Sequence, residues 1–301
     1  MARKRDVVVG VIIGLVFLAG MVFVGLMFVS ILGQGGQVDF AVGSGNVGVV
    51  EVDGVIDETS GRRAIEQIDR FADMNSIKAI VIHINSPGGG VSISQEVYDA
   101  IIRARDDKPV VADCASVAAS GGYYIACAAD RIVANPGTLT GSIGVILQFH
   151  TFYKLMDKWG IGTEVIKSGD MKDVGSYAKQ MTDEERLMLR AVVMDSYEQF
   201  VSAVAEGRGM DKEDVYPLAD GSVFTGLQAQ NHGLVDTLGG LYEAVGLAGE
   251  LAGLTGEPKI VRPYERRKFS VWDVLNQTLS KIQPDVMQDI KSPELMYLFK
   301  F

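Results

Sequence analysis

The chain has 301 residues, with 28 Lys and Arg against 38 Asp and Glu, and a formal net charge of −10. This length suits one sizeable domain or two small ones. The negative charge argues against nucleic acid as a partner, because phosphate contacts need clustered basic side chains. The two cysteines, Cys114 and Cys127, lie in apolar stretches without metal-ligand spacing, so both are expected to be core residues rather than a redox pair.

The strongest signal of topology lies near the N-terminus. Residues 7–32 carry no charge, and their only polar side chain is Ser30. At about 1.5 Å per residue, a helix of this length crosses a bilayer core of about 30 Å. Basic residues at positions 3–5 should keep residues 1–6 in the cytoplasm and place the rest of the chain outside the cytoplasmic membrane. The alternative is a cleaved signal peptide, whose apolar region usually runs only about 7–15 residues.

Composition divides the remainder into three parts. A glycine-rich linker is predicted over 33–45, a single domain without internal repeats over 46–257, and a C-terminal extension over 258–301. In the extension, Val271, Val274, Leu275 and Leu279 could share one helix face, whereas prolines interrupt the stretch that follows. The apolar residues 295–301 are expected to dock on a neighbouring molecule or to fray.

Within the domain, short apolar runs alternate with stretches of helical periodicity. This alternation predicts parallel βαβ units and therefore an α/β fold. Strands are predicted at 49–56, 77–84, 109–114 and 131–134, and extended segments at 142–149 and 163–166. Helices are predicted at 62–74, 92–105 with Ser92 as the N-cap, 121–129, 152–159, 183–207, and around Leu227 and Leu241.

Ser120 is the most informative single residue, because it stands between a predicted strand and a predicted helix. Its neighbours are small: Ala118 and Ala119 precede it, and Gly121 and Gly122 follow. Several hydrolases present a nucleophile at such a turn, with helix N–H groups beside the hydroxyl. A serine in an apolar run is more often a buried structural hydroxyl, so the assignment depends on partners elsewhere in the chain.

A second loop could supply one such partner. Residues 85–90 read Asn-Ser-Pro-Gly-Gly-Gly and join a predicted strand to a predicted helix. A glycine N–H in such a loop can point at a developing negative charge and form an oxyanion hole. The alternative is a plain strand-to-helix turn. A phosphate site is poorly supported, because the loop lacks both the Lys-Ser/Thr of a P-loop and the G-x-G-x-x-G spacing.

A nucleophilic serine also needs a base. His83, His150 and His232 are the only histidines, and none has a recognisable catalytic setting. A lysine made neutral by burial can serve instead. Lys172 follows an extended segment, although most lysines are solvated surface charges.

Four motifs occur in order along the chain: residues 85–90, 118–126, 140–145 and 168–173. Together they resemble the motifs of the signal peptide peptidase A family, in its short bacterial form, and residues 220–229 and 233–240 resemble its C-terminal signature. The resemblance covers about residues 46–255. It implies a crotonase/Clp-protease-like fold of stacked ββα units, preceded here by one N-terminal transmembrane helix.

The resemblance also implies roles for individual residues. Ser120 matches the nucleophile and Lys172 the general base of a Ser/Lys dyad, and Ser142 matches a serine that orients the lysine. Gly88 or Gly89, together with Gly121, matches the oxyanion hole. No metal or other cofactor is required.

The implied activity is that of a membrane-anchored serine endopeptidase in the bacterial cytoplasmic membrane, with its catalytic domain on the periplasmic or extracellular side. Hydrophobic signal peptides left after their release, or other peptides, are the implied substrates. The implied assembly is a homo-oligomer in which copies share active sites. Two alternatives are an inactive membrane scaffold of the same fold, and an acyl-CoA hydratase or isomerase, which would need acidic catalytic residues and no outward-facing anchor.

Overall fold

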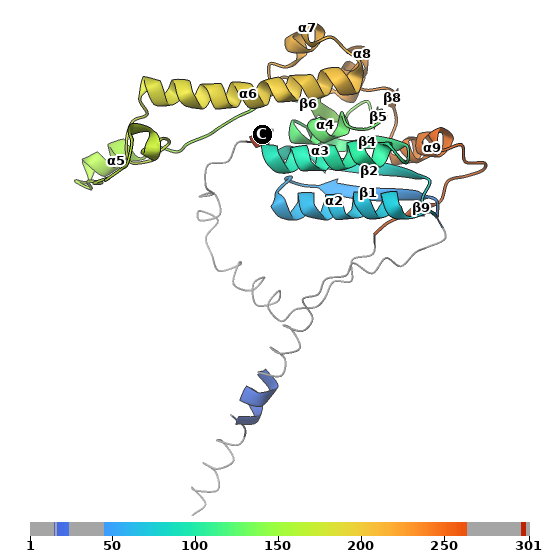
Figure 1. The fold of residues 1–301 in the computed structure, drawn as a ribbon, viewed down its shortest axis with the longest axis horizontal. Helices are drawn as coiled ribbons and strands as arrows, with labels where there is room; N and C mark the ends of the chain where they lie inside the picture. Colours follow the sequence, from blue (N-terminus) through green and yellow to red (C-terminus); the bar gives the residue numbers. More distant parts are fainter. Residues whose placement is uncertain (1–14, 16, 24–44, 264–295, 299–301) are drawn as a thin grey trace, which may run out of the picture. The chain divides into compact units, whose positions relative to one another are not determined.

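The computed structural model describes residues 15, 17–23, 45–263 and 296–298 (Figure 1). Residues 15 and 17–23 are helical and exposed. Most of the predicted membrane segment 7–32, and the helix predicted around 271–279, lie outside the described residues. Among the helices that are described, none is both long enough and apolar enough to cross a membrane.

The centre of the described domain is a mainly parallel sheet, which confirms the predicted α/β class. Its strands run in the order β7-β6-β4-β2-β1-β9, while β5 pairs with β4 and β8 pairs with β5; only the β6–β7 pairing is antiparallel. The strands are β1 (Val47–Asp53), β2 (Ala79–Ser86), β4 (Val110–Ala119), β5 (Arg131–Ala134), β6 (Leu139–Gly141), β7 (Val223–Thr225), β8 (Thr237–Leu238) and β9 (Ile260–Val261). A second, two-stranded sheet pairs β3 (Gly88–Gly90) with β10 (Met296–Leu298).

Helices cover both faces of the large sheet. They are α2 (Glu58–Asp73), α3 (Val91–Arg105), α4 (Gly121–Ala126), α5 (Tyr153–Lys158), α6 (Asp183–Arg208), α7 (Lys212–Val215), α8 (Gly226–Asn231) and α9 (Leu241–Leu251), with 3₁₀ turns η1 (Asp170–Asp173) and η2 (Tyr216–Leu218). Because side chains alternate along a strand, Val47 and Val49 pack towards α9, whereas Gly48 between them lies against Phe71 of α2. Both cysteines are buried and unpaired, as predicted.

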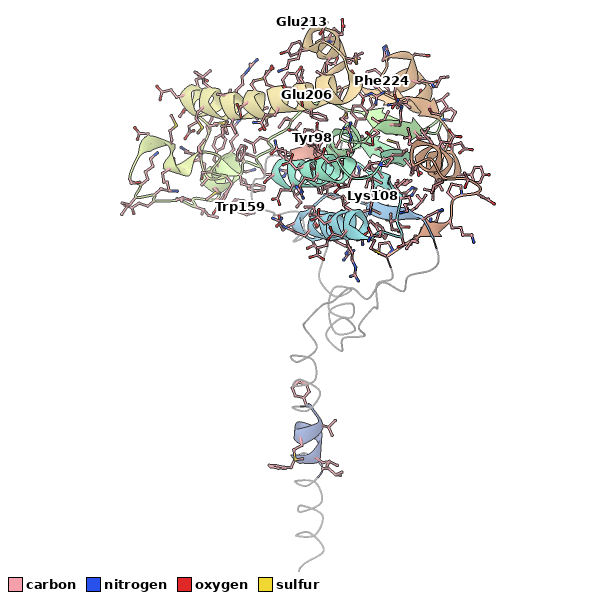
Figure 2. The ribbon with its side chains drawn as sticks, turned by 45° about the vertical axis from the view of Figure 1, so that its right-hand side comes forward. Tyr98, Lys108, Trp159, Glu206, Glu213 and Phe224 are labelled. Atoms are coloured by element: carbon pink, nitrogen blue, oxygen red, sulfur yellow. The ribbon has the colours of Figure 1, made fainter. Side chains whose placement is uncertain are left out.

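Local signals account for where the longest helices begin and end. Thr182 and Glu185 form a capping box at the start of α6, and Gly209, at φ 62°, ends the helix in a left-handed conformation. At the end of α2, the ammonium group of Lys108 donates hydrogen bonds to the carbonyls of Phe71, Ala72 and Met74 (Lys108 is labelled in Figure 2). Burial there lowers the pKa of Lys108.

The structure corrects several predicted elements. Helix α3 begins at Val91 with Gly90 as its N-cap, so Ser92 is not the cap. The segments 142–149 and 163–166, predicted to be extended, belong to no strand of the sheet, although Ser142 and Ile143 form backbone hydrogen bonds with Ser222 and Gly221. The C-terminal residues 296–298 pair with β3 of the same chain instead of docking on a neighbour or fraying.

Residues 144–181 form an arm that packs against the N-terminal half of α6. Figure 1 shows α5 beyond the first turns of this helix, away from α4. Within the arm, the Phe152 N–H donates to the Tyr177 carbonyl, and residues from both the arm and α6, including Leu147 and Leu189, line an open groove. Many apolar side chains of the arm remain exposed, including Trp159 at 68% (Figure 2) and Ile166 at 96%.

Two helical glycines allow a matched test of packing. A methyl group at Gly207 of α6 would lie 2.1 Å from the Cys127 carbonyl oxygen, whereas one at Gly246 of α9 would meet nothing within 4 Å. We expect Gly207→Ala to lower the free energy of unfolding by about 1–3 kcal/mol, because a packed interface must move. Gly246→Ala should raise it by about 0.5–1 kcal/mol through helix propensity. Urea unfolding measures both, and equal stabilisation by the two variants would contradict the close α4–α6 contact.

Candidate active site

Ser120 occupies a strained turn at the junction of β4 and α4. Its backbone has φ 53° and ψ −117°, a conformation that residues with side chains seldom adopt. The Ser120 N–H donates to the Gly141 carbonyl over 2.8 Å, and the Ser120 carbonyl accepts the Tyr124 N–H over 2.8 Å. Strain of this kind persists only where the surroundings fix it, and it gathers at functional sites.

Ser142 lies beside Ser120 because of strand register. The last register pair of β4 and β6 is Ala119 with Gly141, so the two serines follow directly on neighbouring parallel strands. Such strands lie about 4.8 Å apart. Ser142 also has a positive φ, of 50°, and is 8% exposed.

Buried threonines hold β6 in this register. Thr140 Oγ1 donates to the Ala118 carbonyl over 2.7 Å, and Thr138 Oγ1 donates to the Ala115 carbonyl over 2.6 Å. The strand β4 pairs with β5 over its first half and with β6 over its second. The change of partner therefore brings the segment that ends in Ser142 to the end of β4.

The glycines of β3 approach the N-terminus of α4 closely. A methyl group at Gly121 would lie 3.1 Å from the Gly89 nitrogen and 2.9 Å from Ser94 Oγ. The Gly88 N–H donates to Ser86 Oγ over 3.0 Å, and the Gly90 N–H donates to the Ile56 carbonyl over 2.9 Å. Among the three, Gly89 is the residue whose N–H is turned away from these partners and towards α4 and β10.

Within a single chain, Lys172 does not lie near the two serines and the glycines described above. It is exposed on η1, and its ammonium group has no hydrogen bond or ion pair within the described part of the chain. The next residue, Asp173, binds Lys179 over 2.7 Å, and Lys179 binds Glu185 in the first turn of α6. The hydrogen bonds that Asp173 accepts from Lys179 and Lys167 lower its pKa to about 2.

The length of helix α6 shows how far Lys172 lies from Ser120. Tyr124, in the helix that follows Ser120, packs against Phe200 with ring centroids 5.1 Å apart. Glu185 and Phe200 are fifteen residues apart on α6, which is about 22 Å along its axis. The structure thus brings together Ser120, Ser142, Gly88, Gly89 and Gly121, and leaves Lys172 near the other end of this helix.

Comparison with known proteins identifies the family. The family model for peptidase family S49 matches residues 102–255, which is just over half of the chain and includes Ser120, Ser142 and Lys172. The chain belongs to peptidase family S49. The Clp protease model matches residues 46–137, which contain the first strands of the sheet and Ser120.

Three relatives of this S49 peptidase are named as proteases or peptidases. A putative protease of Synechocystis sp. is 43% identical over 205 residues, covering 68% of this chain and 74% of the relative. A putative signal peptide peptidase SppA of Enterococcus faecium is 38% identical over 176 residues, covering 58% and 51%. The chloroplastic serine protease SPPA of Arabidopsis thaliana is 35% identical over 214 residues, covering 70% and 32%. The chain thus spans about half of the Enterococcus relative and a third of the Arabidopsis one.

These matches confirm the resemblance to the signal peptide peptidase A family and the coarse prediction of a serine peptidase. The roles of individual residues remain predictions from the resemblance. Within the described ranges, no cluster of three or more His, Cys, Asp or Glu residues could hold a metal ion.

Sequence reasoning missed one part of the site of this S49 peptidase. Tyr297 of β10 is fully buried among aromatic side chains from α4 and α6, next to Gly88 and Gly121. The apolar run 295–301 was the available signal, but nothing local in it specifies β3 as its partner.

No histidine takes the place of the missing base among the described residues. His83 Nδ1 lies 2.6 Å from Asp113 Oδ2, and its strand position puts it on the α9 side of the sheet, as for Val81 two residues earlier. Helix α4 packs on the opposite side, where Gly122 approaches Ile84. His150 is exposed, and His232 packs against Phe224.

The His83–Asp113 pair predicts a pH-dependent contribution to stability. The hydrogen bond to Asp113 raises the pKa of His83 above its usual 6.5, against the opposing effect of burial. A pKa raised by folding gives stability that is fully present below about 6.5 and is lost as pH rises through the higher folded value.

We therefore expect the loss of unfolding free energy in His83→Gln, relative to the unsubstituted chain, to be larger at about pH 5.5 than at about pH 8.5. Urea unfolding across this range measures the difference, and the exposed His150→Gln is the matched control. A loss that stays constant, or grows as pH rises, would refute the charged pair.

Proposed function

We propose that this S49 peptidase is a serine endopeptidase with Ser120 as nucleophile, Lys172 as general base and Ser142 as the residue that orients the lysine. The observation that carries the proposal is the strained backbone of Ser120, a residue that directly precedes α4 and therefore adjoins Gly121, which itself approaches Gly89. Small residues on both sides of Ser120 leave room for a peptide backbone.

The chemistry follows from these positions. Lys172 in its neutral form takes the proton of Ser120 as Oγ attacks a peptide carbonyl, and the N–H groups of Gly89 and Gly121 donate to the resulting oxyanion. Collapse breaks the C–N bond, and the proton passes from lysine to the leaving amine. Water, deprotonated by the same lysine, then hydrolyses the acyl-enzyme and regenerates Ser120. Gly88 contributes conformation at φ 103°, because its own N–H is bonded to Ser86.

We place Lys172 in the site of a neighbouring copy of the chain. An ammonium group must lose its proton before it can accept one, and burial favours the neutral form. Lys172 is exposed in one chain and separated from Ser120 by about 22 Å of α6. Docking of a second copy can supply both the burial and the missing proximity.

The arm offers the surface for this docking. Exposed apolar side chains gather on it and on the adjoining face of α6, including Trp159, Ile166 and Leu187. Exposed apolar patches of this kind mark interaction surfaces. A homo-oligomer assembled through the arm covers them and carries η1 of one copy to the β4–α4 junction of the next.

The finer assignments rest on sequence and on the names of relatives. We propose a crotonase/Clp-protease-like arrangement of ββα units, in keeping with the Clp protease match. Residues 7–32 would anchor the domain to a bacterial cytoplasmic membrane, on its periplasmic or extracellular side. Hydrophobic remnant signal peptides are the proposed substrates, in line with the name of the Enterococcus relative.

Labelling with a fluorophosphonate, which reacts with activated serines, tests the nucleophile. We expect the reagent to modify Ser120 in the full chain, and Ser120→Ala to abolish labelling, because only an activated hydroxyl attacks phosphorus. Mass spectrometry of the labelled peptide identifies the site. Modification at another serine, with Ser120 unmodified, would reject the assignment.

Mixing two inactive variants tests the shared site. Ser120→Ala and Lys172→Ala should each lower kcat/KM for an unfolded peptide substrate by at least about 10³-fold. Co-assembled in equal amounts, they should recover about a quarter of the activity, because a site works when an intact serine meets an intact lysine from the neighbour. Lys212→Ala, at an exposed lysine of α7 outside the arm, is the matched control and should retain activity. Full activity of Lys172→Ala would reject the assignment of Lys172 as general base. No recovery of activity on mixing would reject the proposal that neighbouring copies share an active site.

A further inference from the structure

The turn that carries Lys172 has little backbone support of its own. The 3₁₀ turn η1 is four residues long, and hydrogen bonds join the Lys172 N–H to the Gly169 carbonyl over 3.1 Å and the Val174 N–H to the Met171 carbonyl over 3.3 Å. Hydrogen bonds of the 3₁₀ type have poorer geometry than those of an α-helix, so such turns stay short. The direction of Lys172 therefore depends on side-chain contacts around the turn.

Asp173, the last residue of η1, is bound by lysines from both sides of the turn. Its Oδ1 accepts from Lys167, which precedes η1, over 2.9 Å and from Lys179, which follows η1, over 2.7 Å. The Lys167 ammonium group also donates to the Asp170 carbonyl over 2.9 Å. One lysine thus ties the first residue of η1 to the last, and the other fixes the last residue to the chain that leads into α6.

The second lysine connects this turn to a buried carboxylate of α6. Lys179 also donates to Glu185 Oε1, and Glu185 Oε2 accepts the Thr182 N–H over 2.9 Å as part of the capping box. The side chain of Glu185 is only 3% exposed, and that of Asp173 is 16% exposed. A carboxylate with both oxygens bonded and little contact with solvent keeps its geometry. The network therefore begins at a fixed point of α6 and ends at the residue next to Lys172.

The alternative is an ordinary surface network that only stabilises the arm. Exposed ion pairs contribute little to stability, because water screens them. Here, however, the two carboxylates are mostly buried and are matched by two ammonium groups. Bound to Lys167 and Lys179, Asp173 forms no ion pair with the adjacent Lys172 within the described chain. A carboxylate in contact with an ammonium group favours the protonated form, in which a lysine cannot accept a proton. The network thus fixes the turn and also occupies the carboxylate that would hinder the base.

The charges of this network persist where a lysine loses its proton. Hydrogen bonds from Lys179 and Lys167 lower the pKa of Asp173 to about 2, and the bond from Lys179 lowers the pKa of Glu185. The two carboxylates in turn raise the pKa of Lys179. A lowered carboxylate pKa keeps the group ionised until the pH falls through that value, so Asp173 stays charged at neutral and alkaline pH.

We propose that Asp173 is a positioning residue of the peptidase site, which directs Lys172 towards Ser120 of the neighbouring copy. Lys167 and Lys179 hold Asp173 in place and keep its carboxylate from pairing with Lys172. The inference deepens the proposed function, on which it rests, because it requires Lys172 to be the base. Asp173 touches neither the substrate nor the serine in this arrangement, and acts only through Lys172.

The pH profile of kcat, measured on the full chain with an unfolded peptide substrate, tests the positioning. At the alkaline plateau Lys172 is neutral in every variant, so the plateau reports its position alone. Asp173→Asn should lower this plateau at least about tenfold and leave KM within about twofold, because a misplaced base slows proton transfer without weakening substrate binding. Asp170→Asn is the matched control. It removes the same charge from η1 but no side-chain hydrogen bond within the described chain, so it should keep the plateau.

Two outcomes would overturn the positioning role. One is a plateau for Asp173→Asn within about twofold of the unsubstituted chain, and the other is an equal loss in Asp170→Asn. Size-exclusion chromatography checks assembly. If Asp173→Asn fails to assemble, Asp173→Glu decides, because it keeps the charge and displaces the carboxylate by one methylene group. An undiminished plateau in that variant contradicts the proposal.

The pH at which kcat is half-maximal tests whether the carboxylate is kept from Lys172. Lys179→Ala leaves one negative charge of the network uncompensated, so this midpoint should rise by at least about half a pH unit. Adding Asp173→Asn restores the balance of charge, so the midpoint should return while the plateau stays low. Lys179→Arg, which can keep both ion pairs, should change neither value. A midpoint that is constant or falls in Lys179→Ala would overturn this part of the proposal, and a merely structural network would leave it constant.

The outcome is separable from that of the proposed function. Full activity of Lys172→Ala would reject Lys172 as the base, and this inference with it. An inactive Lys172→Ala together with a full plateau in Asp173→Asn would reject this inference alone.

Discussion

The left-handed backbone at Ser120 is the constraint on which the rest of the site depends. A conformation of this kind costs about 1–3 kcal/mol and persists only where neighbouring structure over-determines it. Here β2 pairs with Ala118, β6 pairs with Ala119, and the first turn of α4 uses the Ser120 carbonyl. The same pairings bring Ser142 and the glycines of β3 to the end of β4, so the strain and the assembly of the site have one origin.

Much of the α/β core was predictable because local patterns agree with the tertiary structure. The strand at 131–134 and the helix α6 were predicted within a residue of their observed ends, from an apolar run and from helical periodicity respectively. The strand predicted at 109–114 is five residues longer at its C-terminal end. Its extension contains several alanines, which favour strands weakly, and it is extended because Thr138 and Thr140 bind its carbonyls.

The site was predictable only where its residues follow neighbouring strands. Ser120, Ser142 and the glycines stand directly after strands of one sheet or at the loop beside it, so local motifs locate them. The positions of Lys172 and Tyr297 depend instead on contacts distant in sequence. The length of α6 sets how far Lys172 lies from Ser120. A run of three glycines carries no side-chain pattern that would predict β10 as the pairing partner of β3.

Because β3 consists of glycine alone, it offers an incoming chain only main-chain groups. Such an edge can be completed only by a polypeptide whose own amides and carbonyls are unpaired, and chains already folded into helices or sheets have none to spare. If peptides bind at this edge, as the proposed function requires, the site selects unfolded over folded polypeptide before any side chain is compared.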